Sequence, residues 1–320
     1  MSWEAALEQA VSDAPPIVHK GPVIVPGRYV LIDGDYAAYY YAGHDETTIG
    51  DARTRLMQAF QNFKEMAGAE HVVVHLTATG SHKGYRGAVS TILPYQENRS
   101  GSKRPKNWAA LRDCMESYSG HLFRQKIWGS READDGICYH LRVLHEQGNP
   151  AVVAMKDKDS QMFTGCIHLD WDTYELTDVP RDTFYQENSV GRVFGSKWFW
   201  LQMLMGDSAD NIPGVQKIRG VTKMVGCGPA RARDALIMAA DDEDCCIRVV
   251  KAYQQNYGEA WAAAFAENAA LLWMRDDRHA EVNAFAQFIK AEWFGAEAIH
   301  QAADELAARI KEAVDAANNF

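Results

Sequence analysis

Short apolar runs and amphipathic segments alternate along the first two thirds of the chain. Apolar runs typical of buried strands occupy residues 29–32, 71–76, 122–128, 150–155 and 166–171. Helices are predicted where apolar residues recur every three to four positions, at 51–67, at 107–118, from Ser130 onward and at 196–205. Strands that alternate with helices predict an α/β fold, a twisted and largely parallel sheet flanked by helices.

The rest of the chain has a different pattern. Residues 1–27 are rich in Pro-Pro, Gly-Pro and Pro-Gly pairs and predict an N-terminal extension. From about residue 230 the pattern is helical and Ala-rich, and the amphipathic stretch at 296–316 predicts a packing helix. The predicted organisation is therefore an extension at 1–27, an α/β core at 28–205 and a helical part at 206–320.

Acidic residues follow the predicted strands. Asp33 and Asp35 come after the first strand, and Asp157 and Asp159 come after a later one. Ligands of open α/β sheets bind outside the carboxyl ends of strands, so these two turns can face one crevice. Further acids lie in the first turn of a predicted helix and beside a helix end; these are Glu132, Asp134, Asp135, Asp207 and Asp210.

These acids can be explained one motif at a time. The READD segment can complement the dipole of a helix, and DGD and KDKD can be turns. Together, however, carboxylates about 4 Å apart repel by roughly 1–4 kcal/mol per pair. Several such pairs exceed the ~5–15 kcal/mol stability of a domain, so cations must neutralise them. Oxygen ligands without nearby Cys or His favour two Mg²⁺ or Mn²⁺ ions, which can clamp a phosphodiester during displacement.

Composition adds limits rather than a function. The chain has 320 residues, 47% hydrophobic and 24% charged, which is typical of a globular protein. It contains no apolar run of about 18 residues, so a membrane-spanning helix is not expected. The N-terminus lacks a signal-peptide pattern, and six cysteines without a CxxC pair predict reduced thiols in a cytosolic protein.

The net charge of −10 alone argues against a nucleic-acid binder, but the bases are segregated. Residues 82–106 contain one acid, Glu97, and the bases Lys83, Arg86, Arg99, Lys103, Arg104 and Lys106. Residues 216–233 contain no acid and the bases Lys217, Arg219, Lys223, Arg231 and Arg233. Either segment can be a solvated basic loop. Beside a metal-type acidic set, binding to a phosphate backbone is the better interpretation.

Six motifs occur in an order that is known from one family. They are IDGD (32–35), YQENR (95–99), EADD (132–135), DKD (157–159), GDSADNIPGV (206–215) and GCGPARA (226–232). Over about residues 29 to 275 the chain resembles the 5′-nuclease family of flap endonucleases and 5′→3′ exonucleases. Its small size and its Trp- and Ala-rich tail are most similar to the phage branch.

The resemblance implies a PIN-like core, followed by a helix–three-turn–helix element that grips duplex DNA with the help of a monovalent cation such as K⁺. It assigns the first of two Mg²⁺ or Mn²⁺ ions to Asp33, Glu132 and Asp134. The second is held or supported by Asp135, Asp157, Asp159, Asp207 and Asp210. An arch or gateway at 80–118 admits the 5′ strand, and Arg99 steers the scissile phosphate. DNA-binding candidates are Arg86, Tyr95, Arg104, Lys106, Lys223, Gly226, Gly228, Arg231 and Arg233.

The sequence departs from the family in two places. Thr77, Ala78 and Thr79 stand where the second strand usually ends in an aspartate, and Asp35 is a candidate replacement. Gln96 stands where the family has a lysine that assists the attacked phosphate, and Lys83 or Lys103 can take its catalytic role.

The leading hypothesis is a metal-dependent 5′→3′ exonuclease or flap endonuclease that leaves 5′-phosphate products on DNA. A role in phage DNA replication or degradation, in the host cytoplasm, follows from the resemblance alone. The alternative is a catalytically weak or inactive DNA-structure-binding protein on the same fold. A PIN-like ribonuclease is disfavoured by GDSADNIPGV, although an RNA–DNA hybrid stays open as a substrate.

Overall fold

The computed structural model describes residues 23–99, 101, 103–219 and 224–318. Most of the predicted extension at 1–27 lies outside the described residues. The first strand begins at Val25, three residues before the predicted start of the core at residue 28. Among the described residues, no helix combines the length and the apolar character needed to span a membrane.

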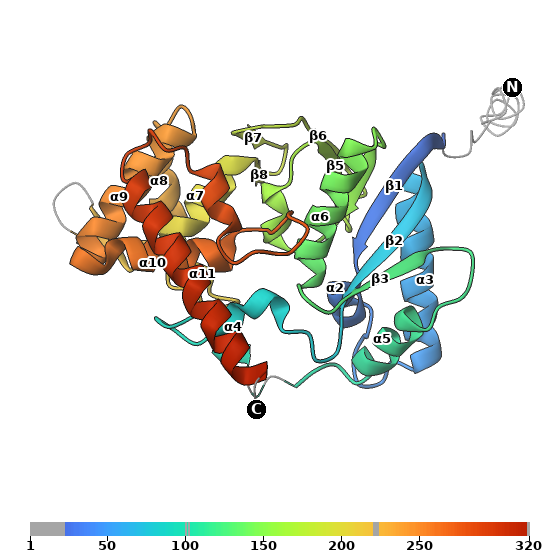
Figure 1. Cartoon of the computed structure of the whole chain (residues 1–320). Coiled ribbons are helices and arrows are strands. Elements are labelled where there is room, and N and C mark those ends of the chain that lie inside the picture. Colours follow the sequence, from blue (N-terminus) through green and yellow to red (C-terminus); the bar gives the residue numbers. More distant parts are fainter. Residues whose placement is uncertain (1–22, 100, 102, 220–223, 319–320) are drawn as a thin grey trace, which may run out of the picture.

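A six-stranded sheet forms the centre of the first part of the chain (Figure 1). Its strands are β1 (Val25–Asp33), β2 (Ala69–Thr77), β3 (Arg124–Trp128), β4 (Ala151–Ala154), β5 (Cys166–Leu169) and β6 (Leu176–Val179). Their order is β3-β2-β1-β4-β5-β6, and only β6 runs antiparallel to its neighbour. The predicted α/β fold with a largely parallel sheet is confirmed.

Helices cover both faces of this sheet because the inner strands are apolar on both sides. One face packs against α2 (Gly34–Tyr40), α3 (Ile49–Met66) and α5 (Trp108–Glu116). The other face packs against α6 (Ala133–Glu146). Leu31 of β1 lies in the α6 core while its neighbours Val30 and Ile32 lie in the opposite core, as the two-residue period of a strand requires.

The C-terminal part is helical and has its own core. Its helices are α7 (Ser196–Met205), α8 (Pro229–Leu236), α9 (Asp242–Tyr257), α10 (Trp261–Leu272) and α11 (Ala296–Asn318). The helix predicted at 196–205 is confirmed, but Phe199 and Trp200 pack with the C-terminal helices rather than with the sheet. The domain limits at 27 and 205 stay a prediction.

Short elements complete the fold. Strands β7 (Gln186–Glu187) and β8 (Val193–Phe194) form one hairpin, and β9 (Lys217–Arg219) and β10 (Met224–Gly226) form another. The segment between β2 and α5 contains η1 (Lys83–Tyr85), α4 (Arg86–Val89) and η2 (Glu97–Arg99). Further short turns are η3 (Lys158–Met162), η4 (Gly258–Ala260) and η5 (Ala284–Phe288).

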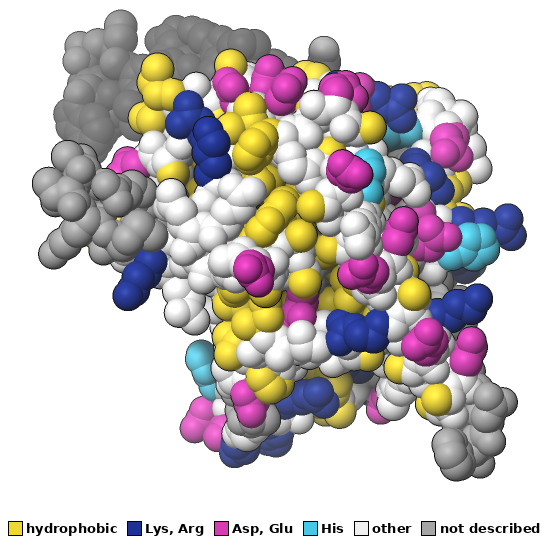
Figure 2. Space-filling view, turned by 60° about the vertical axis from the view of Figure 1, so that its left-hand side comes forward, with side chains coloured by type: hydrophobic (Ala, Val, Ile, Leu, Met, Phe, Trp, Pro, Cys, Tyr) yellow, Lys and Arg dark blue, Asp and Glu magenta, His cyan; other side chains and the backbone are white. Residues whose placement is uncertain are grey.

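Figure 2 shows the molecule with the side of the helical part turned forward. Acidic and basic side chains are interspersed there around a central band of hydrophobic ones. The described residues on this face therefore form no continuous basic track, and the segregation of bases along the sequence does not produce one here.

Candidate active site

Three carboxylates come together at the carboxyl edge of the sheet. Asp33 ends β1 and is 7% exposed, and Asp157 follows β4, which pairs with β1 in parallel. Glu132 is the N-cap residue of α6. The charges of Asp157 and Glu132 both act on Asp33, which places the ends of two strands and a helix N-terminus around one site, as predicted.

A second group of acids lies beside the first. Asp159, Asp207 and Asp210 each offer a carboxylate oxygen, and these oxygens lie within 4.8 Å of one another. The turn that carries two of them is closed by paired backbone hydrogen bonds of 2.8 Å between Asp207 and Ile212. This turn directly follows α7, so the helical part contributes acids to the same group as Asp159.

The chemistry of these donors fits a divalent cation. Burial, followed by the charges of neighbouring acids, raises the pKa of Asp33 to about 7. Burial also raises the pKa values of Asp134 and Asp159 well above their usual range, and nearby carboxylates raise both further. Buried carboxylates that repel one another are stabilised by a cation, and an all-oxygen set favours Mg²⁺ or Mn²⁺.

Basic side chains from distant segments reach the same acids. Their ion pairs include Lys158 with Asp207 at 2.5 Å, Arg99 with Asp210 at 2.5 Å, and Lys83 with Glu132 at 3.3 Å. The predicted catalytic residues Lys83 and Arg99 therefore lie at the acids. Lys103 is exposed, and no contact between it and the acids is seen.

Tyr95 connects the two groups of acids. Its hydroxyl lies 2.9 Å from Glu132 Oε2 and 3.2 Å from Asp210 Oδ2. Burial and the surrounding carboxylates raise the pKa of Tyr95 well above its usual value, so the phenol keeps its proton and can donate it to either oxygen. This side chain is a hydrogen-bond donor within the acid set, which comprises Asp33, Glu132, Asp134, Asp157, Asp159, Asp207 and Asp210. Its contact with DNA stays a prediction.

Two predicted metal ligands are engaged by arginines. Asp35 forms an ion pair with Arg112 and accepts from the Thr77 backbone N–H at 3.2 Å. Asp135 is fully buried and receives two hydrogen bonds from Arg86, at 2.5 and 2.9 Å. A guanidinium therefore already binds each of these two carboxylates in this structure.

The prediction that Arg86 binds DNA is wrong for this structure. The side chain belongs to α4 of the gateway and is 1% exposed. Its Nε donates to Leu271 O at 3.2 Å, and its Nη2 donates to Trp273 O at 3.3 Å. Arg86 therefore ties the gateway, the first turn of α6 and the end of α10 together.

The other DNA-binding candidates lie on the surface. Arg104 stacks on the Trp108 ring at 4.1 Å, and Lys106 donates to Asp45 O at 3.1 Å. Four further candidates, between the end of β10 and the second turn of α8, are exposed; these are Gly226, Gly228, Arg231 and Arg233. Lys223 lies outside the described residues.

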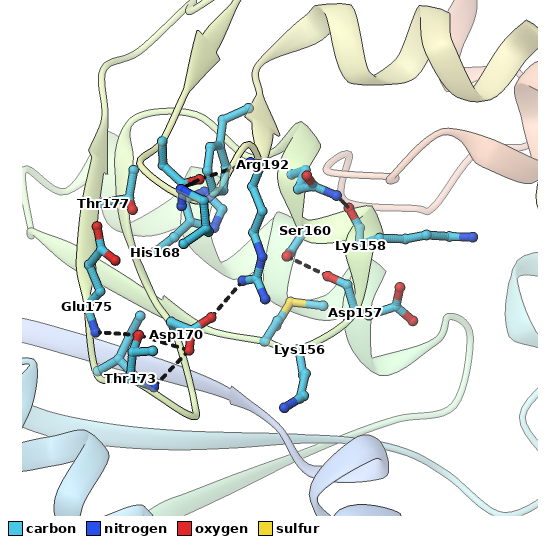
Figure 3. A pocket seen from close by; sticks show the side chains of 16 residues that line it. Lys156, Asp157, Lys158, Ser160, His168, Asp170, Thr173, Glu175, Thr177 and Arg192 are labelled. Carbon is cyan, nitrogen blue, oxygen red and sulfur yellow. Dashed lines mark hydrogen bonds and ion pairs between the residues drawn. The ribbon is translucent and has the colours of Figure 1, made fainter. Parts of the chain in front are cut away.

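A small pocket of about 190 Å³ adjoins the acids (Figure 3). Arg192 reaches into it and pairs with Asp170 at 2.9 Å. Asp157 and Lys158 form one edge, and their side chains point away from Arg192. The pocket is therefore a neighbour of the acid set and not part of it.

The chain is similar in sequence and in fold to known nucleases. No family model matches the chain. A curated 5′-3′ exonuclease of Buchnera aphidicola (subspecies Schizaphis graminum) is 22% identical over 207 residues, which are 63% of this chain and 68% of the relative. A crystal structure of bacteriophage T5 flap endonuclease with DNA and metal ions has a TM-score of 0.55 at 15% identity and covers 89% of this chain and 99% of its own.

A structure of bacteriophage T5 5′-exonuclease with bound zinc gives a TM-score of 0.54 at 16% identity, over 87% of this chain and 98% of its own. The fold is that of the bacteriophage T5 5′-exonuclease. The resemblance read from the motifs is thus confirmed, and the phage branch is among the structural neighbours. All of these proteins are nucleases by name.

The two departures from the 5′-nuclease motifs have local explanations. Thr77 ends β2, and its Oγ1 accepts from the Ala133 backbone N–H at 2.9 Å, in the first turn of α6. Gln96 donates from Nε2 to Asp210 Oδ1 at 2.9 Å. Both side chains therefore contact the acidic elements, although neither brings the charge that the family has there.

Some residues that contact these acids were missed in the sequence. Lys158 lies within KDKD, where its pairing with an acid 49 positions away has no sequence signal. Gln202, fully buried on α7, donates to Asp159 Oδ1 at 2.5 Å. Gln202 is a polar residue inside the apolar run SKWFWLQMLM, and this could have indicated a polar partner, because buried amides form hydrogen bonds.

Proposed function

We propose that the chain is a metal-dependent 5′→3′ exonuclease or flap endonuclease that hydrolyses DNA phosphodiesters and leaves 5′-phosphate products. The observation that carries this is the set of buried carboxylates with raised pKa values, into which basic side chains of the gateway reach. The names of the sequence relative and of the structural neighbours support the same activity.

The proposal assigns roles by residue. Asp33, Glu132 and Asp134 hold one Mg²⁺ or Mn²⁺ ion, and Asp157, Asp159, Asp207 and Asp210 hold or support a second. Two such ions supply an activated water and stabilise the leaving oxygen. Arg99 and Lys83 offer donors to the scissile phosphate, and Tyr95 holds Glu132 and Asp210 in register.

Binding of the substrate involves surfaces away from the acids. The glycines and arginines at the start of α8 offer backbone N–H groups and positive charge to a DNA backbone, and a monovalent cation such as K⁺ completes this element. Duplex ends, nicks, 5′ flaps and RNA–DNA hybrids fit this chemistry. A role in phage DNA replication or degradation, in the host cytoplasm, belongs to the same proposal.

The test uses a 5′-labelled flap and a 5′-labelled blunt duplex, each with EDTA, Mg²⁺ or Mn²⁺. Metal-dependent release of mononucleotides or flap oligomers supports the proposal and separates the two activities. Asp134→Ala and Asp210→Ala should each abolish cleavage while DNA binding persists. Binding without cleavage in either metal would instead favour the inactive DNA-binding protein.

A further inference from the structure

The side chains of Lys83 and Gln96 meet at the entrance to the acid set. Lys83 Nζ lies 2.9 Å from Gln96 Oε1 and 3.3 Å from Glu132 Oε1. Gln96 Nε2 lies 2.9 Å from Asp210 Oδ1. Because an amide accepts at one end and donates at the other, Gln96 bridges an ammonium and a carboxylate.

The backbone at both positions is held in an uncommon conformation. Lys83 has a φ of 51° and Gln96 a φ of 57°, both in the left-handed region that side chains disfavour. The Gln96 N–H donates to Asp210 O at 3.0 Å, and the Lys83 N–H donates to Ser81 Oγ at 3.1 Å. Strain that the surroundings enforce at two facing residues indicates a functional constraint on how these side chains point.

Neutralising the charge of Glu132 is not a sufficient explanation for the position of the Lys83 ammonium at this site. Glu132 also pairs with the buried Arg86, at 3.2 Å, so Lys83 is not its only cationic partner. The Lys83 side chain is 42% exposed, against 13% for Glu132. A phosphate that arrives from the gateway side can therefore reach the Lys83 ammonium.

We propose that Gln96 is a positioning residue that holds the Lys83 ammonium at the acid set, where it contacts an oxygen of the scissile phosphate. This inference rests on the proposed nuclease function and deepens it. Of the two lysines that the sequence offers to replace the one missing at position 96, the geometry selects Lys83 over Lys103.

A double-mutant cycle tests the coupling. Lys83→Met, Gln96→Ala and the double variant are compared in single-turnover cleavage of a 5′-labelled flap with Mg²⁺. Loss of the ammonium should lower the rate about 10²-fold, and loss of its support about tenfold. Because the Gln96 side chain holds Lys83 and also donates to Asp210, Gln96→Ala should lower the rate by a smaller factor in the Lys83→Met background than in the wild type. A loss equal to the product of the two single losses would overturn the proposal.

Moving the ammonium from position 83 to position 96 tests whether the charge itself supports cleavage, because a purely structural role of Lys83 would not be restored. Lys83→Met combined with Gln96→Lys places an ammonium on the residue that already faces Asp210. Cleavage should recover at least about tenfold over Lys83→Met alone, which reverses part of the loss of that donor. No recovery would contradict the proposal. Lys311→Met, at an exposed position of α11, is the matched control and should leave the rate unchanged.

A measurement without turnover separates this inference from the proposed function. Acetylation of Lys83 by acetic anhydride, followed by peptide mass spectrometry, reports how well its amine is held. In metal-free protein, Gln96→Ala should increase the Lys83 acetylation rate by about threefold or more, as expected for the loss of one hydrogen bond, while the rate at Lys311 stays constant. An unchanged rate refutes the positioning role. Absence of cleavage by the wild type in Mg²⁺ and Mn²⁺ would refute the nuclease proposal instead.

Discussion

Replacement of Arg86 distinguishes a structural role from a DNA contact. Arg86→Met leaves the carboxylate of Asp135, which is fully buried, with one remaining donor, the Arg275 backbone N–H at 2.9 Å. Removal of one partner from a buried ion pair costs about 3–5 kcal/mol, because an uncompensated charge stays inside. The substitution also removes the hydrogen bonds that the guanidinium donates to the carbonyls of Leu271 and Trp273. We therefore expect a loss near the upper end of that range.

Urea unfolding, followed by tryptophan fluorescence and circular dichroism, measures this loss. Arg86→Met combined with Asp135→Asn removes both charges, and most of the free energy of unfolding should return. Arg86→Lys keeps one charge but not the paired donors, so it should be intermediate.

DNA binding supplies the contrasting readout. The slope of log affinity against log salt should be the same for wild type and for Arg86→Met, measured below the unfolding transition, since the Arg86 side chain is buried away from a phosphate backbone. The reasoning is refuted if Arg86→Met unfolds like the wild type while its salt slope falls by about one.

Three further predictions concern the elements around the site. Thr77→Val removes the hydroxyl that accepts from the Ala133 N–H, and should lower the free energy of unfolding by about 1–2 kcal/mol in urea titrations, with Thr77→Ser close to wild type. Gly214 has a φ of +56° and its added Cβ would collide with the Gly206 backbone, so Gly214→Ala should lower the melting temperature and weaken Mn²⁺ binding measured by calorimetry. Burial lowers the pKa of His140 to about 4, so the unfolded chain gains a proton that the folded chain excludes; stability should fall as the pH drops from about 6.5 towards 4, and His140→Gln should flatten that fall in thermal melts.

The order of strands and helices could be predicted because it depends on local periodicity. The run at 29–32 is buried on both faces, and the acids that follow it lie at the carboxyl edge for the same geometric reason in any parallel sheet. Helix α7 was equally plain as a helix. The elements that α7 packs against could not be predicted, because a helix that is apolar on all sides does not indicate which core it enters.

The pairings inside the site could not be predicted, because they depend on the path of the gateway. Six bases at 82–106 look alike in sequence, yet Arg86 is buried, Lys83 faces Glu132 and Lys103 is exposed. Charge and spacing do not separate these outcomes. Only the tertiary course of the chain between β2 and α5 decides which base meets an acid and which meets solvent.

The end of β2 shows how a site position can contribute without a charge. Three acids of the set, Glu132, Asp134 and Asp135, begin α6, and their placement depends on how that first turn is held. Glu132, the N-cap residue, gives this helix no side-chain cap of its own, and the hydroxyl of Thr77 accepts from the Ala133 N–H in its place. The same residue's N–H donates to Asp35, which Arg112 also binds. A carboxylate at Thr77 would add another negative charge among acids whose pKa values are already raised by burial and mutual repulsion. A threonine there fixes the acidic turn without adding to that repulsion.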